Sequence, residues 1–275
     1  MKKRGTTVIL LLVLIVGLSL MLYPTVSNWW NNMTQSRAVA SYVEAVAQID
    51  EEQYARLWNE AEEYNRSLTT RDNNFLLSEE QREAYYKILD VGGLGIMGYI
   101  EVPSIGVVLP IYHGTNESIL QVTVGHLEWT SLPIGGESTH CVISGHRGLP
   151  SARLFTDLDK MTEGDVFVLR VLDEVLTYEV DQILIVSPHE TDQLQIVEGE
   201  DLCTLLTCTP YGVNSHRLLV RGHRVENQEE AIVVRATADA TQIRPVIVAP
   251  MLAIPMLLLL LIAMLIPKSK KRRND

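Results

Sequence analysis

The sequence predicts a mainly β domain, built as a closed or partly closed barrel and held outside a membrane between two membrane helices. From residue 97 onward, short apolar and β-branched runs are separated by Gly, Pro, Asn and Asp, which is typical of short strands joined by turns. The residues before this region have helical periodicity. Near each end of the chain lies an apolar run of about 20 residues, long enough to cross a bilayer.

The first apolar run, residues 6–24, is expected to be a retained membrane helix. It follows the basic residues 1–5, as in a signal peptide, but it exceeds the roughly 7 to 15 apolar residues of such a peptide, and no A-x-A cleavage site follows. The second run, residues 246–266, contains Pro250 and Pro255, which membrane helices tolerate. A buried core helix is the alternative, but the basic tail at residues 267–275 argues against it. The positive-inside rule then places both termini in the cytoplasm and the middle of the chain outside the cell.

The charge of the middle of the chain argues against nucleic-acid binding. The formal net charge is −11, and eight of the 23 basic residues lie in the two terminal segments. The middle keeps 15 basic residues against 33 acidic ones, which is not the composition of a nucleic-acid-binding domain. Only three cysteines occur, so the chain is not a disulfide scaffold.

Residues 25–96 are expected to form a helical extension. Apolar residues recur at helical spacing over residues 27–49. Asp50 and Ser78 each begin a capping-box pattern, which predicts helices running to about Tyr64 and to about Leu89. The mostly polar residues 65–77 are predicted to be a loop.

Residues 97–225 are expected to form the β domain, and residues 226–245 a mostly polar connector to the second membrane helix. The pattern predicts seven strands, at residues 98–102, 107–112, 140–144, 165–171, 175–185, 202–208 and 218–223. The sequence contains no internal repeat, P-loop or dinucleotide-binding fingerprint.

Two predicted strands end on residues that suit acyl transfer through a thioester. The run TLLTC ends on Cys208, and Arg217 begins the next strand; upstream, the run CVISG is followed by His146. A thiolate is the competent nucleophile, and a neighbouring histidine and arginine supply positive charge that favours it. A cysteine acting only as a small buried hydrophobe would need no such neighbours.

The segments around these residues resemble those of class C, pilin-polymerising sortases. The TLLTC run with the downstream HR pair resembles the TLxTC…R signature of that family. Wider matches are the segments GYIEVPSIGVVLPIYHGT, VGHLEWTSLPIGG, ISGHRGLPSARLFTDLDKM, GDVFVL, YEVDQI and LLTCTPYGVNSHRLLVRGHR. The resemblance implies a sortase-type eight-stranded β-barrel, here with an N-terminal helical extension and two flanking transmembrane helices.

The resemblance also implies the chemistry. Cys208 is the expected nucleophile, His146 the general acid and base, and Arg217 the group that stabilises the oxyanion or the substrate. The expected reaction cleaves an LPxTG-like sorting signal between Thr and Gly and transfers the acyl group to a pilin lysine. Transfer to cell-wall peptidoglycan amines is the alternative, and a non-catalytic surface binding module is a second one. The expected partners are pilin subunits or other LPxTG-type surface proteins, the membrane and a peptidoglycan precursor, with no cofactor and no nucleic acid.

Further residues are assigned around this centre. Ser144, Thr204 and Thr207 are expected to line the site or to support its residues. Arg221 and Arg224 follow Arg217 closely, and strand parity separates 217 from 221 poorly. The match to the family's HR pair selects Arg217.

The remaining candidate groups are interpreted as structural. The spacing of His126, His140, His216 and His223 fits no zinc site, so these histidines are expected to be structural or supporting. The acidic group Asp157, Asp159 and Glu163 does not have the spacing of an EF-hand calcium loop, so it is interpreted as solvated surface charge.

Cys141 and Cys203 each lie five residues before a proposed catalytic residue, which places them on the opposite face of their strands. If the two strands are neighbours, as the resemblance implies, the thiols lie close together. Buried free thiols are the main expectation and a disulfide is the alternative.

One segment departs from the class C pattern. Class C sortases usually carry an Asp-Pro-aromatic lid over the groove, whereas this chain has Asp72 and Phe75 without the proline that would stiffen it. A loose lid, a different use of Phe75 and an ordinary polar loop all stay open.

Overall fold

The fold is that of a computed structural model, which describes residues 2–69 and 77–227. The chain forms two units: residues 26–233, and the terminal residues 1–25 with 234–275. Of the terminal unit, only residues 2–25 are described, and the expected second membrane helix at 246–266 lies outside the described residues.

The first helix, α1, runs from Lys2 to Val46 without interruption and contains Pro24. The segments expected to be helical at 6–24 and 27–49 belong mostly to this one helix, which continues through Pro24 and ends at Val46. The stretch Leu10–Val46 is long and apolar enough to cross a membrane, with a mean hydropathy of 2.2 in its most apolar window. None of that window is buried in the protein, so this segment needs another apolar environment.

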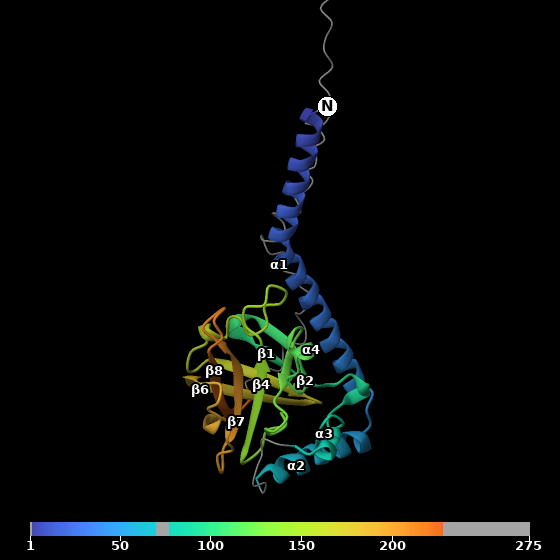
Figure 1. Cartoon of the computed structure of the whole chain (residues 1–275). Coiled ribbons are helices and arrows are strands. Elements are labelled where there is room, and N and C mark those ends of the chain that lie inside the picture. The colour runs from blue at the N-terminus through green and yellow to red at the C-terminus, as the bar shows by residue number, and fades with distance from the viewer. Residues whose placement is uncertain (1, 70–76, 228–275) are drawn as a thin grey trace, which may run out of the picture. The chain divides into compact units, whose positions relative to one another are not determined.

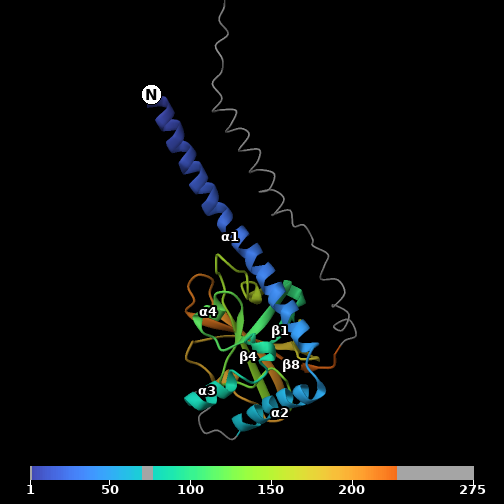
Figure 2. The same ribbon diagram turned by 90° about the vertical axis from the view of Figure 1, so that its right-hand side faces the viewer.

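The extension packs onto the barrel through buried polar contacts. The Tyr42 hydroxyl, from the part of α1 that belongs to the larger unit, donates to the Met97 carbonyl (3.1 Å) and accepts from the Leu172 amide (2.8 Å). Helix α2, Glu51–Leu68, begins at the Asp50 cap, and helix α3, Glu79–Tyr85, begins at a complete capping box. Both predicted caps are therefore confirmed. Figure 2 shows α2 and α3 together beside one end of the barrel.

The β domain is a closed barrel of eight strands in the order β1-β2-β3-β4-β7-β8-β6-β5. The strands are β1 Ile96–Val102, β2 Val107–His113, β3 Val124–His126, β4 Thr139–Gly145, β5 Val166–Val171, β6 Glu174–Val186, β7 Asp201–Thr209 and β8 His216–Val225. The short helix η1, Val91–Gly93, precedes β1, and the short helices between the strands are η2 Pro103–Ile105, α4 Glu117–Leu120, η3 Leu158–Lys160 and η4 Asp192–Leu194. The barrel confirms the mainly β, eight-stranded part of the predicted fold. The sequence pattern missed β3, which has three residues and is too short to show alternation.

Strands β4, β7 and β8 are the neighbours that matter for function (Figure 1). β4 and β7 run parallel, and β7 and β8 run antiparallel. β4 begins near α2, where Thr139 lines a hollow together with Asn65 and Arg66. Both parallel strands therefore end at the opposite end of the barrel.

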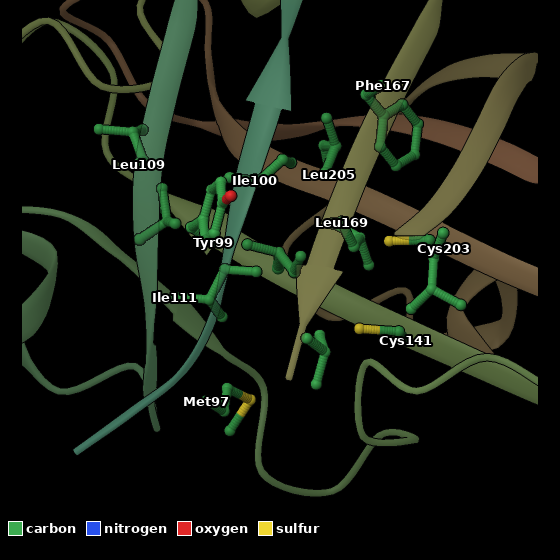
Figure 3. Packing of buried hydrophobic residues seen from close by; sticks show 14 of the residues in the cluster. Met97, Tyr99, Ile100, Leu109, Ile111, Cys141, Phe167, Leu169, Cys203 and Leu205 are labelled. Atoms are coloured by element: carbon green, nitrogen blue, oxygen red, sulfur yellow. The ribbon is translucent and has the colours of Figure 1, made fainter. Parts of the chain in front are cut away.

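The barrel interior is filled by apolar side chains, of which Figure 3 shows Phe167, Leu169 and Leu205 close to two cysteines. Cys141 and Cys203 are direct partners in the β4–β7 register, are almost fully buried and are free thiols. The expected proximity of these two thiols is confirmed. Because successive residues of a strand alternate between faces, the even-numbered residues near them point to the outside of the barrel.

Candidate active site

Cys208 lies near the end of β7 on the outer face of the barrel. Cys203 and Leu205 point into the core, so alternation turns Leu206 and Cys208 outward. Leu206 packs there against a second, smaller apolar cluster that includes Leu194 of η4. Cys208 itself is partly exposed, whereas the other two thiols are buried. Of the three thiols, it is therefore the one that a substrate can reach.

Arg217 is the direct cross-strand partner of Cys208 in the β7–β8 pair. Residues that face each other in this way project their side chains from the same face, with Cβ atoms about 4.5–5.5 Å apart. The Nη1 atom of Arg217 donates to the carbonyls of Asn214 (3.2 Å) and His216 (3.1 Å). Within the described part of the chain, no carboxylate pairs with this guanidinium, so its charge is free to act on an anion beside Cys208.

The two neighbouring arginines of β8 are already engaged elsewhere. Arg221 makes a two-pronged contact with Asp181, at 3.1 and 2.8 Å. Arg224 donates to the Val175 carbonyl (3.2 Å) and lies 4.0 Å from Asp201. These contacts support the choice of Arg217 over both.

His146 follows directly after β4, the parallel neighbour of β7. The ladder between the two strands reaches Ser144 opposite Leu206, and continuing it by two residues brings His146 to the level of Cys208. The Thr207 hydroxyl donates to the Gly145 carbonyl (2.7 Å) and holds the two strand ends together at this point. The ring Nε2 lies 3.7 Å from a carboxylate oxygen of Glu117 in α4, and the side chain is 27% exposed. Histidine, cysteine and arginine are thus brought to one end of three adjacent strands.

The three residues assigned around the centre have different surroundings. Ser144 shares the outer face of β4 with His146 and is partly exposed, so it can line the site. Thr207 is fully buried and acts through its bond to Gly145. Thr204 lies further from the strand end, where its hydroxyl bonds to His140 Nε2 (2.7 Å). The site-lining interpretation of Thr204 therefore gives way to a supporting one.

The buried histidines have structural partners. The Nδ1 atom of His140 donates to the Gln195 carbonyl (2.8 Å), which fixes the β6–β7 connection against β4. Burial lowers the pKa of His140, although the bond to Gln195 opposes this shift. His126 Nε2 donates to the Ser131 carbonyl (2.8 Å), and its Nδ1 accepts from the Tyr85 hydroxyl (2.9 Å). The described residues contain no cluster of three His, Cys, Asp or Glu side chains arranged to hold a metal ion.

Asp157 and Asp159 of the β4–β5 connection are ion-paired, which corrects their interpretation as solvated charge, whereas Glu163 is exposed as expected. Asp157 pairs with Arg153 and, at 2.7 Å, with Lys160. Burial opposes its ionisation, but hydrogen bonds from these two cations outweigh that effect and lower the pKa of Asp157. Asp159 pairs with Arg147.

Sequence reasoning missed Arg147, Glu117 and Asp159 as neighbours of the site. Arg147 stands directly after the candidate histidine, and this position was the only available signal. Glu117 and Asp159 lie far from His146 in sequence and look like ordinary surface acids. Asp72 and Phe75, the candidate lid, lie outside the described residues.

The arrangement places a reachable thiol, an imidazole ring and a guanidinium on one face. Among the described residues this guanidinium has no carboxylate partner, and the strand of the thiol lies between those of the ring and the guanidinium. These groups suit nucleophilic acyl transfer, because the cation can stabilise both a thiolate and an oxyanion.

Comparisons with known proteins agree with this site. The family model of the sortase domain matches residues 100–225. The solved structure of sortase C1 from Streptococcus agalactiae is 52% identical with a TM-score of 0.68, and the match covers 70% of this chain and 100% of that one. The solved structure of sortase C from Streptococcus pneumoniae, which gave insights into catalysis and pilin substrate specificity, is 46% identical with a TM-score of 0.63. That match covers 70% of this chain and 97% of that one.

A curated relative gives the same family. Sortase D of Bacillus subtilis is 30% identical over 131 residues, which are 46% of this chain and 63% of the relative. This chain thus spans somewhat less than two thirds of that protein. Full coverage of the streptococcal structure at 52% identity is the stronger finding. The chain belongs to the sortase family, and its structural relatives within that family are class C sortases.

Proposed function

We propose that this chain is a membrane-anchored class C sortase, a cysteine transpeptidase that joins pilin subunits through isopeptide bonds. Residues 97–225 are the catalytic domain, residues 25–96 the helical extension and residues 226–245 a connector. Residues 6–24 and 246–266 cross the membrane, with residues 1–5 and 267–275 in the cytoplasm. The observation that carries the proposal is the direct pairing of Cys208 with Arg217, beside the strand that leads to His146.

In the first half-reaction, the Cys208 thiolate attacks the carbonyl carbon between Thr and Gly of an LPxTG-like sorting signal. The oxyanion that forms is stabilised by Arg217, which has no competing carboxylate within the described residues. When the C–N bond breaks, the His146 imidazolium donates its proton to the departing glycine amine. The acyl group remains on Cys208 as a thioester.

In the second half-reaction, an incoming primary amine attacks the thioester carbonyl. His146 accepts a proton from that amine, and Cys208 leaves again as the thiolate. With a pilin lysine as the amine, the product is an isopeptide bond between two subunits. The class C relatives support this acceptor, and a peptidoglycan amine is the alternative that the experiment distinguishes.

The test is carried out in cells that depend on this enzyme for their surface fibres. Wild-type chain should produce covalent ladders of the sorting-signal protein, and mass spectrometry should find a lysine side chain in the new amide bond. Cys208→Ala should abolish the ladders. Ladders that persist unchanged with Cys208→Ala would refute the enzyme proposal, and a peptidoglycan amine in the bond would replace pilin polymerisation by wall attachment.

Asp72 and Phe75 are proposed to form an atypical lid over the groove. The support is the position of this Asp-aromatic pair in a polar segment between α2 and α3, together with the class C resemblance. Replacing both residues by alanine should raise the rate at which a thiol reagent labels Cys208. An unchanged labelling rate would remove the lid from the proposal.

A further inference from the structure

The residue after His146 reaches toward the residue after Cys208. Arg147 is 9% exposed in its side chain, although it carries a full positive charge. Its Nη1 atom donates to the Thr209 hydroxyl (3.4 Å), and its Nη2 atom pairs with Asp159 of η3. One guanidinium therefore contacts two segments that are distant in sequence from each other.

The ring of Tyr211 covers the same group. The Arg147 Cζ atom lies 5.9 Å from the centre of this ring, within the range of a cation–π contact. Gly148 has a φ of +77°, and a Cβ atom there would come within 3.1 Å of the Tyr211 ring. The connection between β7 and β8 thus packs directly on the backbone that follows His146.

Together with Thr207, this contact forms a symmetric pattern around the two candidate catalytic residues. Thr207, which precedes Cys208, bonds to the carbonyl of Gly145, which precedes His146. Thr209, which follows Cys208, bonds to Arg147, which follows His146. The residues on both sides of the nucleophile are therefore tied to the residues on both sides of the histidine.

The free-energy cost of burying the Arg147 guanidinium indicates that its contacts with Asp159 and Thr209 have a role. A buried guanidinium is unfavourable unless it is paired, and an unsatisfied buried N–H adds to the penalty. Within residues 2–69 and 77–227, the Nε atom of Arg147 has no hydrogen-bond partner. An apolar side chain of similar volume would avoid both penalties but could not hold Asp159 and Thr209 at the same time.

We infer that Arg147 is a positioning residue, which, through Asp159, Thr209 and Tyr211, holds His146 in register with Cys208. The inference rests on the proposed roles of Cys208 and His146. Lysine would keep the charge but would lose the planar fork that reaches both oxygen atoms and the flat face that stacks on the ring.

The test uses the full chain in detergent micelles and a sorting-signal peptide. The variants are Arg147→Lys, which removes the planar fork, Asp159→Asn, which removes its ionic partner, and Thr209→Val, which removes its hydroxyl partner. Arg221→Lys is the matched control, because Arg221 and Asp181 form an ion pair of the same kind away from the strand ends. The measured quantities are kcat and KM for thioester formation, the melting temperature, and the rate of alkylation of Cys208 by iodoacetamide.

Loss of the contact is expected to lower kcat by about 10- to 100-fold, while KM stays within about two-fold, because misplacement of a reacting group affects the transition state rather than peptide binding. Alkylation of Cys208 at pH 7 should slow several-fold, since a misplaced imidazolium favours the thiolate less. The double variant Arg147→Lys with Asp159→Asn should be no slower than the slower single variant, because both changes break the same Arg147–Asp159 contact. Arg221→Lys should leave kcat and alkylation at wild-type values.

A kcat within two-fold of wild type in folded Asp159→Asn and Thr209→Val would overturn the inference, whether or not Arg147→Lys folds. A lowered melting temperature with unchanged kcat and alkylation would also overturn it, because the contact would then be purely structural. Failure of the wild-type chain to form a thioester would refute the proposed function instead, and the alkylation rates would still decide whether Arg147 acts on Cys208.

Discussion

Replacing Arg217 with lysine is expected to remove most of the transpeptidase activity and to leave the stability of the fold unchanged. Arg217 faces Cys208 across the β7–β8 pair, and its described partners are two backbone carbonyls of its own turn. Lysine keeps one positive charge at this place but loses the fixed fork of N–H donors. Removing one oxyanion donor typically lowers kcat by about 10²- to 10³-fold, or about 2.7–4 kcal/mol of transition-state stabilisation. The lost bonds are partly solvated, so the expected change in melting temperature is small.

The matched control is Arg221→Lys on the same strand. Arg221 and Asp181 are 24% and 27% exposed and make two short bonds. Loss of this fork should cost about 1 kcal/mol, which corresponds to about 2–4 °C in melting temperature for a domain of this size. Its activity should stay at the wild-type value, because its contacts lie four residues from the position opposite Cys208.

The assay combines steady-state transpeptidation of a sorting-signal peptide with thermal unfolding of the same preparations in detergent. Arg217→Lys should lose activity without losing stability, and Arg221→Lys should lose stability without losing activity. Retention of more than half of the wild-type kcat by Arg217→Lys would refute its role. Equal losses of activity in both variants would show that general disturbance of β8, and not the guanidinium, limits the rate.

Two further predictions concern stability. Tyr42→Phe removes a hydroxyl that bonds to two buried backbone groups, so it should cost about 1–3 kcal/mol and lower the melting temperature by about 3–10 °C. The control is Tyr54→Phe, whose exposed hydroxyl lies 3.4 Å from Glu174 and whose loss should change the melting temperature little. Equal shifts in the two variants would contradict the docking of α1 described above. Burial lowers the folded-state pKa of His140, so this histidine takes up a proton more readily in the unfolded chain than in the folded one. As the pH drops below about 6.5 toward the folded-state pKa, the stability of the fold should therefore fall by up to about 1.4 kcal/mol per pH unit. Denaturant titrations between pH 7.5 and 5 should show this loss in the wild type and a smaller slope in His140→Gln; identical slopes would mean that His140 is not held neutral.

Local patterns were sufficient for the elements whose signals are contained in neighbouring residues. The caps at Asp50 and Ser78 depend on side chains three residues apart, and both helices begin where predicted. The longer strands show alternation over enough residues to be recognised. β3 has three residues and is held by its pairing with β2 and β4, which no local pattern reveals.

The site residues also divide into those whose proximity follows from local sequence and those brought together only by tertiary contacts. Cys208 and Arg217 are joined by an antiparallel pair that is close in sequence, so their proximity follows from a short turn between two predicted strands. The neighbourhood of His146 and Cys208 depends on a parallel pairing across a long connection, and only the family resemblance could indicate it. Asp159 contacts Arg147 because the loop after β4 folds back on itself. Such a tertiary contact leaves no periodic signal in the sequence.

The nucleophilic role of Cys208 is tested most directly by the intact mass of the full-length protein after reaction with a sorting-signal peptide in the absence of an acceptor amine. The expected result is an adduct equal to the peptide acyl fragment, bound to Cys208, released by hydroxylamine and absent in Cys208→Ala. An adduct on Cys141 or Cys203, or the same adduct in Cys208→Ala, would contradict the assignment of the nucleophile. Cleavage of the peptide by wild-type protein without any covalent adduct under rapid quenching would contradict the thioester mechanism itself.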